Sequence, residues 1–248
     1  GIPVTLLEQN VIPGRATRWL SRRSTSVCVT FPETVGMLPR ARNCRVTGNP
    51  VRNNLASVAG CTPVGRVVVL GGSQGARRLN ETVPWALGAS KVDPSDWEVL
   101  HQCGESPIEP ICDAYRKAGW RARVVPFLEA PEAWLPDAGL VIARAGGTTL
   151  AELACVGCAS ILVPYPHATD NHQHANARWF SERSAAVVVE ETRGEMFRRR
   201  LGIEIGAQMR CDQSRGRLAA NIMRLGIPHA AVAVAEEVQR LVPALQAA

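Results

Sequence analysis

Two periodicities of apolar residues alternate along the chain. Short runs rich in Val, Ile and Leu are typical of buried strands, and the longer segments between them have apolar residues at helical spacing. The expected strands cover residues 4–7, 27–30, 45–47, 66–70, 98–101, 123–126, 140–143, 160–163 and 186–189. The expected helices cover residues 15–23, 76–87, 108–118, 132–135, 149–156, 171–183, 215–225 and 230–245. This alternation predicts an α/β fold with a doubly wound parallel sheet.

The pattern is interrupted once, where Gly, Asn and Pro at residues 48–50 break regular structure. Residues 1–52 are therefore expected to be the C-terminal part of one domain, residues 53–65 an irregular linker, and residues 66–248 a complete second domain. The run at residues 2–7 already has the pattern of a buried strand, so we expect more of the first domain to lie upstream of this chain.

The last expected helix has one apolar face. Its spacing predicts that this face is buried, and a return of the helix to the first domain stays open as an alternative. The residues of the face are Val234, Val238, Leu241 and Leu245.

Composition narrows the class of protein. Of 248 residues, 46% are hydrophobic and 20% are charged, which argues for a folded globular protein and against disorder. The net charge of +6 suits an anionic partner such as a nucleotide. The densest basic stretches, residues 15–23 and 198–200, lack the series of aromatic side chains of a nucleic-acid platform. Solvated helix faces are therefore favoured, and no nucleic-acid partner is expected.

The cysteines and the hydropathy pattern indicate neither a disulfide scaffold nor a membrane span. Eight cysteines are spread along the chain, and packing is favoured over metal or redox chemistry for the one close pair, Cys155 and Cys158. No apolar run reaches the roughly 18 residues that a membrane span needs, and no signal peptide is recognisable. No metal and no cofactor are expected.

The first motif with chemical meaning is a strand that runs into the turn GGSQGA at residues 71–76 and then into a helix. Glycine lets the backbone approach a phosphate, and a helix start presents free N–H groups. The spacing does not fit the GxGxxG fingerprint of dinucleotide-binding proteins. On this motif alone, a phosphate-binding turn and a tight turn without a ligand are equally favoured.

A second strand runs into RAGGTTLAE at residues 144–152. Thr148 or Thr149 is expected to cap the helix, whose free N–H groups could hold a diphosphate. The carboxylate of Glu152 could accept bonds from two ribose hydroxyls, and the alternative is that it complements the helix dipole. Because two such turns follow strands of one sheet, a ligand crevice at their carboxyl ends is favoured.

The third motif is the polar loop and helix start PYPHATDNHQHANA at residues 164–177. The compact donors and acceptors of residues 170–173 suit sugar hydroxyls. The histidines of this motif could instead indicate a metal. However, His172 and His174 are two residues apart on a helix start and point to different faces, so sugar binding is favoured.

Five motifs follow one another in order along nearly the whole chain. They are EQN at 8–10, GNPVR at 48–52, GGSQGA at 71–76, RAGGTTLAE at 144–152 and DNHQHANA at 170–177, and a late IPHA at 227–230 follows them. The set closely resembles the bacterial glycosyltransferases of family 28 that act on undecaprenyl-diphosphate-linked muramyl-pentapeptide with UDP-N-acetylglucosamine as donor. The sequence departs from the family pattern at Leu7, Thr17 and Ala159.

The resemblance implies a GT-B architecture of two Rossmann-like domains, the C-terminal one of which binds the donor. It implies that Glu152 holds the ribose and that Gln173 holds sugar hydroxyls. It also implies that the Leu128 backbone reads the uracil edge and that Arg52 brings positive charge into the cleft. The implied donor contacts are Asn10, Arg52, Ser73, Leu128, Gly147, Thr148, Thr149, Leu150, Ala151, Glu152 and Gln173.

The resemblance further implies an inverting transfer without an essential metal, in peptidoglycan biosynthesis. The 4-hydroxyl of the lipid-linked sugar attacks the anomeric carbon, and UDP leaves. The implied partners are UDP-N-acetylglucosamine, the lipid-linked muramyl-pentapeptide and the inner membrane surface, with the protein peripheral at the cytoplasmic face of the cell membrane. The family's candidate base lies in an N-terminal glycine-rich loop that this chain does not contain, so no catalytic residue is assigned.

Two other functions stay open. One is a transferase of the same architecture that uses another glycolipid acceptor. The other is a non-catalytic UDP-sugar-binding chain that works only beside a partner.

Overall fold

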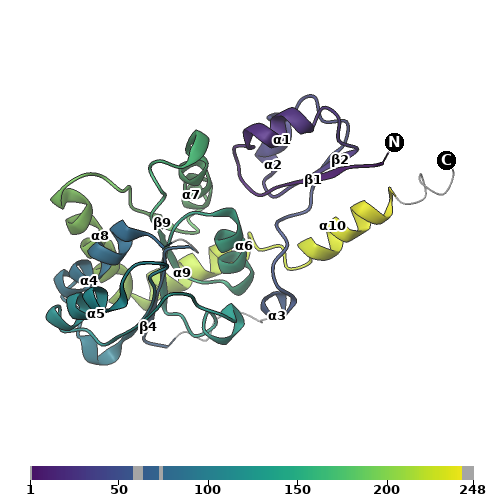
Figure 1. Ribbon diagram of the computed structural model, residues 1–248. Coiled ribbons are helices and arrows are strands. Elements are labelled where there is room, and N and C mark those ends of the chain that lie inside the picture. The colour runs from purple at the N-terminus through teal and green to yellow at the C-terminus, as the bar shows by residue number, and fades with distance from the viewer. Residues whose placement is uncertain (1, 58–63, 73–74, 242–248) are drawn as a thin grey trace.

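The computed structural model describes residues 2–57, 64–72 and 75–241, which contain two parallel sheets (Figure 1). The smaller sheet has the strand order β1-β2-β3, and the larger has the order β6-β5-β4-β7-β8-β9. Each strand lies within one residue of its expected ends, so the predicted parallel α/β fold is confirmed. The strands are β1 (Thr5–Glu8), β2 (Ser26–Val29), β3 (Cys44–Val46), β4 (Arg66–Leu70), β5 (Glu98–Gln102), β6 (Ala122–Val125), β7 (Leu140–Ala143), β8 (Ser160–Leu162) and β9 (Val187–Val188).

The larger sheet reverses its winding at its centre. Strand β4 pairs with β5 on one side and with β7 on the other, and the chain winds outward from this pair in both directions. The register pairs Leu70 with Ala143, which places the turns after β4 and β7 side by side. In open α/β sheets, ligands bind outside the carboxyl ends of the strands at such a switch point.

Helices cover both faces of the larger sheet (Figure 1). One face packs against α4 (Arg77–Ala89), α5 (Ile108–Lys117) and α8 (Glu195–Met209). The other packs against α3 (Asn53–Ala56), α6 (Gly147–Val156), α7 (His172–Glu182) and α9 (Asp212–Met223). Side chains of β4 alternate between the two cores, with Val67 and Val69 in the first and Val68 and Leu70 in the second. A strand that is buried on both faces explains the uninterrupted apolar run at this position.

Helix α8 lies outside the expected helices. Gly202 and Gly206 lie on its buried side. A Cβ on Gly206 would lie 2.6 Å from the Ser90 carbonyl oxygen, and one on Gly202 would lie 3.1 Å from the Ala86 carbonyl oxygen. Close backbone packing against α4 therefore adds to the packing of four buried side chains of α8, those of Phe197, Leu201, Ile205 and Met209.

Two other expectations about local structure are wrong. The segment 53–65 was expected to be irregular, but its first residues form α3, which is anchored by the fully buried side chain of Leu55. The helix expected at 132–135 is instead the 3-10 turn η2 (Pro131–Ala133). An α-helix is disfavoured there because the residue before a proline avoids helical backbone angles, and Pro136 follows directly.

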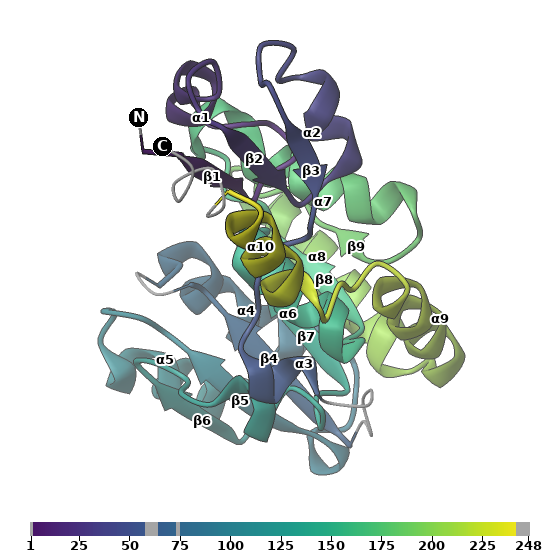
Figure 2. The same cartoon turned by 90° about the vertical axis from the view of Figure 1, so that its right-hand side faces the viewer.

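The smaller sheet packs against the short helices α1 (Arg15–Leu20) and α2 (Pro32–Gly36), and α10 (Ala230–Gln239) crosses beside it (Figure 2). The expected apolar face of α10 is buried only in part, since Val234 and Leu241 are half-buried on the side of Glu237. Val238 is 45% exposed, whereas Glu237 is 3% exposed, and Leu245 lies outside the described residues. The buried carboxylate is satisfied because Ser26 Oγ and Asn43 Nδ2 donate to Glu237 Oε1 over 2.7 and 2.6 Å. In the described part of the chain, no helix combines the length and the apolarity needed to cross a membrane.

Candidate functional site

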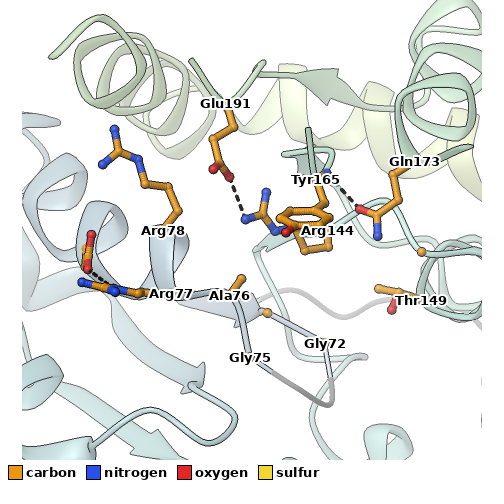
Figure 3. A pocket seen from close by; sticks show the side chains of 13 residues that line it. Gly72, Gly75, Ala76, Arg77, Arg78, Arg144, Thr149, Tyr165, Gln173 and Glu191 are labelled. Carbon is orange, nitrogen blue, oxygen red and sulfur yellow. Dashed lines mark hydrogen bonds and ion pairs between the residues drawn. The ribbon is translucent and has the colours of Figure 1, made fainter. Parts of the chain in front are cut away.

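A cavity of about 780 Å³ opens at the switch point, between the turns that follow β4 and β7 (Figure 3). Its walls also include the start of α4, the loop after β8, the start of α7 and the segment after β9. The lining residues are Gly71, Gly72, Gly75, Ala76, Arg77, Arg78, Glu81, Arg144, Gly146, Thr149, Tyr165, Gln173 and Glu191. The expected crevice therefore coincides with a cavity in the size range of small-molecule sites.

The first turn is shaped by two glycines with left-handed backbone angles, Gly72 at φ 83° and Gly75 at φ 76°. The N–H of Gly75 donates to the Gly72 carbonyl over 3.0 Å. A Cβ on Gly75 would lie 2.4 Å from the Cys103 carbonyl oxygen, so this position requires glycine. Helix α4 then starts without a side-chain cap, which leaves its first N–H groups for a ligand. Ser73 lies outside the described residues, and its assignment as a donor contact stays a prediction.

The second turn leads into α6, whose N-cap is Gly146 and makes no side-chain capping bond. The expectation that Thr148 or Thr149 caps this helix is wrong, because the helix already begins at Gly147 and both threonines lie in its first turn. Thr149 lines the cavity, whereas Thr148 Oγ1 donates to Gln9 Oε1 over 3.4 Å. The uncapped helix start keeps the anion-binding character that the motif predicts.

Arg144 forms one wall of the cavity and was not singled out by the sequence. Its guanidinium lies 2.7 Å from the Glu191 carboxylate, and both side chains are nearly buried. Nη1 of Arg144 also donates to the Val163 carbonyl over 3.1 Å, and the group lies over the Tyr165 ring (Figure 3). The Glu191 carboxylate compensates the charge of Arg144. Arg144 therefore mainly stabilises the wall of the cavity and contributes little to anion binding.

Gln173 reaches the cavity from the start of α7. The Tyr165 N–H donates to Gln173 Oε1 over 3.0 Å, as Figure 3 shows. The side chain therefore bonds the loop after β8 and does not cap its own helix. Among the described residues Gln173 Nε2 is bonded to no acceptor, so this amide end can donate to a ligand.

Glu152 does not line this cavity. It lies half-buried on α6, near Arg52 of the α3 start and Glu132 of η2. Burial raises the pKa of the Glu152 carboxyl, Arg52 opposes that rise and Glu132 adds to it. Arg52 itself is exposed and is the N-cap residue of α3. The structure thus brings Glu152 and Arg52, both expected to contact the donor, close enough for their charges to interact.

Asn10 and Leu128 are held by residues that the sequence did not single out. Asn10 Oδ1 accepts a 2.9 Å bond from Asn176 Nδ2, while the Asn10 backbone N–H donates to Glu8 Oε1. The Leu128 N–H donates to Gln102 Oε1 over 3.2 Å. Leu128 lines a neighbouring cavity of about 510 Å³.

The remaining expected contacts on α6 face the smaller sheet. Gly147, Leu150 and Ala151 line a cavity of about 210 Å³ between the two sheets. A Cβ on Gly147 would lie 2.6 Å from the Gln9 carbonyl oxygen, so the loop after β1 touches the start of α6. Of the expected donor contacts that the structure describes, only Thr149 and Gln173 line the switch-point cavity.

The histidines of the third motif are engaged in local contacts. His172 Nδ1 lies 2.8 Å from the Thr169 carbonyl oxygen, and His174 Nδ1 lies 3.2 Å from a Glu190 carboxylate oxygen. Cys155 and Cys158 are buried and unbonded to each other. Within the described ranges, no group of three or more His, Cys, Asp or Glu side chains is arranged to hold a metal.

Residues 66–198, which carry β4 and most of the walls of the switch-point cavity, match the C-terminal domain of glycosyltransferase family 28. The chain belongs to glycosyltransferase family 28. The larger sheet and its helices accordingly have the fold of the C-terminal half of a GT-B glycosyltransferase.

Two relatives that match nearly the whole chain, beyond residues 66–198, have the same name. The chain is 41% identical over 239 residues to the UDP-N-acetylglucosamine–N-acetylmuramyl-(pentapeptide) pyrophosphoryl-undecaprenol N-acetylglucosamine transferase of Nitrosococcus oceani, covering 90% of this chain and 64% of that protein. It is 39% identical to the protein of the same name from Sorangium cellulosum, covering 97% of this chain and 60% of that protein. The crystal structure of Acinetobacter baumannii MurG superposes with a TM-score of 0.76 at 29% identity, covering 97% of this chain and 67% of that one. The chain thus spans less than two thirds of the length of these two transferases.

Proposed function

We propose that this chain binds UDP-N-acetylglucosamine and forms the donor side of an inverting N-acetylglucosaminyltransferase. The acceptor we propose is the 4-hydroxyl of undecaprenyl-diphosphate-linked N-acetylmuramoyl-pentapeptide, in peptidoglycan biosynthesis, because relatives from two bacteria carry that activity in their names. The observation that carries the proposal is the cavity at the switch point, which combines two glycine turns, two uncapped helix starts and the free amide end of Gln173.

The diphosphate of the donor fits the two helix starts. Among the described residues, the N-cap residues of α4 and α6 make no side-chain capping bond, so both helix starts offer N–H groups and the positive end of a helix dipole. Arg78 lines the same cavity and, among the described residues, has no carboxylate partner, so its charge adds to theirs. Arg77 is paired with Glu81 over 2.8 Å and adds less.

The chemistry then needs little beyond positioning and charge stabilisation. As the acceptor hydroxyl attacks the anomeric carbon, the bond to UDP breaks and negative charge grows on the leaving diphosphate. Fixed N–H groups and dipoles that face this charge stabilise the transition state more than the ground state. Gln173 Nε2 would donate to a sugar hydroxyl and orient the ring for attack. No residue of this chain is proposed as the base.

Contact with a membrane surface is supported by α1. None of its residues is buried, and Trp19 is 61% and Leu20 is 40% exposed. Four arginines lie on or beside this helix, at positions 15, 18, 22 and 23. Exposed apolar side chains among basic residues favour the anionic surface of a membrane over plain solvent. We therefore propose a peripheral position at the cytoplasmic face of the membrane.

We also propose that residues 1–52 belong to the N-terminal domain, that residues 53–65 are the linker and that residues 66–248 form the donor domain. The two separate sheets, one on each side of this linker in the sequence, support this division.

Two measurements on this chain test the proposal. Calorimetric titration should show binding of UDP and UDP-N-acetylglucosamine, with GDP as the control nucleotide. Transfer of labelled N-acetylglucosamine to the lipid-linked acceptor should be weak or absent for this chain alone, since it spans 60–64% of the named transferases. Absence of UDP binding would overturn the proposal. Full transfer by this chain would show that the acceptor side is also present here.

The titration and the transfer assay together separate the other candidate functions. Binding with transfer to a different glycolipid, but not to the muramyl-pentapeptide lipid, would favour the other acceptor. Binding with transfer only after a partner protein is added would favour the non-catalytic donor-binding chain.

A further inference from the structure

The cavity of about 210 Å³ between the two sheets has walls from both parts of the chain. Strand β3 and the segments after β2 and β3 line one side, and α6, α7 and residues 224–227 line the other. Among the described residues, it shares no lining residue with the switch-point cavity. A molecule bound here would therefore contact both parts of the chain and lie apart from that cavity.

Most of this wall is apolar. Phe31 and Phe180 are 2% and 3% exposed, and the Phe31 ring meets Trp179 edge-on with centroids 4.9 Å apart. No aspartate or glutamate of the described residues lines the cavity. Arg183, which lies over the Trp179 ring, pairs with Glu33 over 2.7 Å, so this nearby carboxylate is compensated. The surroundings thus disfavour a cation and accept an apolar body.

Two buried N–H donors of the lining residues lack an acceptor. Asn49 is only 4% exposed, and its Nδ2 has no hydrogen-bond partner among the described residues. The same holds for Nε1 of Trp179. Both residues line the cavity. A buried donor without an acceptor is costly and rare in native structures, so these two indicate a molecule that supplies acceptor oxygens.

Arg224 adds a positive charge to the same lining. Its side chain is exposed, and within the described ranges it makes no ion pair. Two neutral N–H donors and one guanidinium match the oxygens of a carboxylate, which only accepts when it is ionised. A cavity of about 210 Å³ lies below the range of drug-sized ligands, so the molecule must be small.

We propose that this cavity binds a small apolar carboxylate, which accepts from Asn49 Nδ2 and Trp179 Nε1 while Arg224 balances its charge. Such a ligand contacts both walls and stabilises the arrangement of the two sheets seen in this structure. The inference goes beyond the proposed function, because the site lies apart from the switch-point cavity and needs no nucleotide.

Benzoate is the probe, and benzyl alcohol is its uncharged counterpart of similar size. Each is titrated into the wild-type chain without nucleotide, and the backbone amides are followed by NMR. Benzoate should cause saturable shifts on both walls, at Asn49 and at Leu150. Benzyl alcohol should bind at least about tenfold more weakly, because it lacks the charge-assisted bonds. Benzoate should also raise the melting temperature, since it binds the folded chain.

Three substitutions remove the donors one at a time. Asn49→Ala and Trp179→Phe should each weaken benzoate binding at least about tenfold. Arg224→Gln should remove most of the difference between benzoate and benzyl alcohol. Trp134→Phe is the matched control, because Trp134 Nε1 donates to the Glu129 carbonyl over 2.8 Å away from this cavity. It should lower the melting temperature and leave benzoate binding unchanged.

Several results would overturn this site. They are no saturable binding of benzoate, equal binding of benzoate and benzyl alcohol, or unchanged benzoate affinity in both Asn49→Ala and Trp179→Phe. A crystal structure grown with benzoate, in which ordered water alone bonds the two donors, would have the same meaning. None of these measurements uses UDP, so failure of the site leaves the proposed function standing, and failure of UDP binding leaves the site standing.

Discussion

Single side chains in the crevice show what local sequence can and cannot predict. The polar motif at residues 170–173 predicts recognition of sugar hydroxyls, because compact amides and carboxylates can donate to and accept from them. The partner of Gln173 was not predictable, since the Tyr165 N–H reaches it only through the fold of the loop after β8. Gln102 was missed for the same reason, because both of its partners lie on other loops.

Gln173 should discriminate between sugar isomers as a donor. Its Oε1 is occupied by Tyr165, so only Nε2 is free to pair with an equatorial 4-hydroxyl of the gluco sugar. UDP-N-acetylglucosamine should bind more tightly than the galacto isomer, by about 1–3 kcal/mol. Gln173→Glu keeps the bond from Tyr165 but loses the donor, and should erase most of the difference.

Titration of both nucleotide sugars measures this effect. His174→Ala is the control, because the neighbouring side chain is exposed and faces Glu190 instead of the cavity. If Gln173→Glu kept the full preference, recognition of the sugar would have to come from other residues.

Glu152 should affect binding and stability in opposite directions. Its pKa is raised above the ordinary 4.5 chiefly by burial, so the charged form is disfavoured in the fold. A raised carboxyl pKa contributes stability at low pH that is lost as pH rises through the folded value. Glu152→Gln removes this penalty and should keep or raise the melting temperature near neutral pH. The same change should weaken UDP binding by about 1.5–3 kcal/mol if the carboxylate accepts from ribose hydroxyls.

Calorimetry and thermal unfolding test Glu152 together. In the wild-type chain, UDP affinity should also decrease as pH falls through the raised pKa, since the protonated carboxyl loses its acceptor strength. Glu132→Gln serves as the control on the adjoining carboxylate, which is bonded to Asn54. Unchanged UDP affinity in Glu152→Gln would leave Glu152 with the dipole-complementing role alone.

At the scale of elements, strands were predicted more faithfully than helices. A buried parallel strand such as β4 is an uninterrupted apolar run, so its bounds follow directly from the sequence. Helix α8 was not predicted although Phe197, Leu201, Ile205 and Met209 recur at helical spacing, because Gly202 and Gly206, which pack by backbone contact, have low helix propensity. The start of α6 was placed two residues late because glycines, not threonines, open it.

The two glycines that open α6 should respond differently to substitution. A Cβ on Gly147 would lie 2.6 Å from the Gln9 carbonyl oxygen, whereas a Cβ on Gly146 would meet nothing within 4 Å. Neither has a positive φ. Gly147→Ala should therefore destabilise the fold by about 1–3 kcal/mol through overpacking, reduced by up to about 1 kcal/mol of gained helix propensity.

Thermal or urea unfolding of the two variants decides the point. Gly146→Ala should unfold within about 0.5 kcal/mol of the wild type, as an uncrowded surface change would. Equal stability of Gly147→Ala and Gly146→Ala would mean that the loop after β1 does not press on the start of α6 in solution.

At the scale of the whole molecule, contacts between distant segments lay beyond the sequence. The parallel sheet follows from alternating strands and helices, but the position of α10 does not. Glu237 meets Ser26 and Asn43, which are 211 and 194 residues away along the chain. The apolar spacing of α10 therefore did not reveal that Glu237 is buried, because a satisfied carboxylate holds the helix to the smaller sheet.

The bond between α10 and the smaller sheet should weaken in acid. Bonding from Ser26 chiefly lowers the pKa of Glu237, with Asn43 and two arginines adding to the effect. A lowered carboxyl pKa contributes stability above the ordinary value of 4.5, and this contribution is lost as pH falls through the folded pKa. Glu237→Gln should lose this dependence and cost about 1 kcal/mol near neutral pH, because the charge-assisted bonds from Ser26 and Asn43 become neutral, while Arg45 and Arg240 are exposed and contribute little. Amide exchange along α10 between pH 7 and pH 3 measures the effect.

Glu236→Gln is the control variant, because it changes an exposed neighbour on the same helix and should behave as the wild type. Equal acid sensitivity of α10 in wild type and Glu237→Gln would show that another group ties this helix to the sheet.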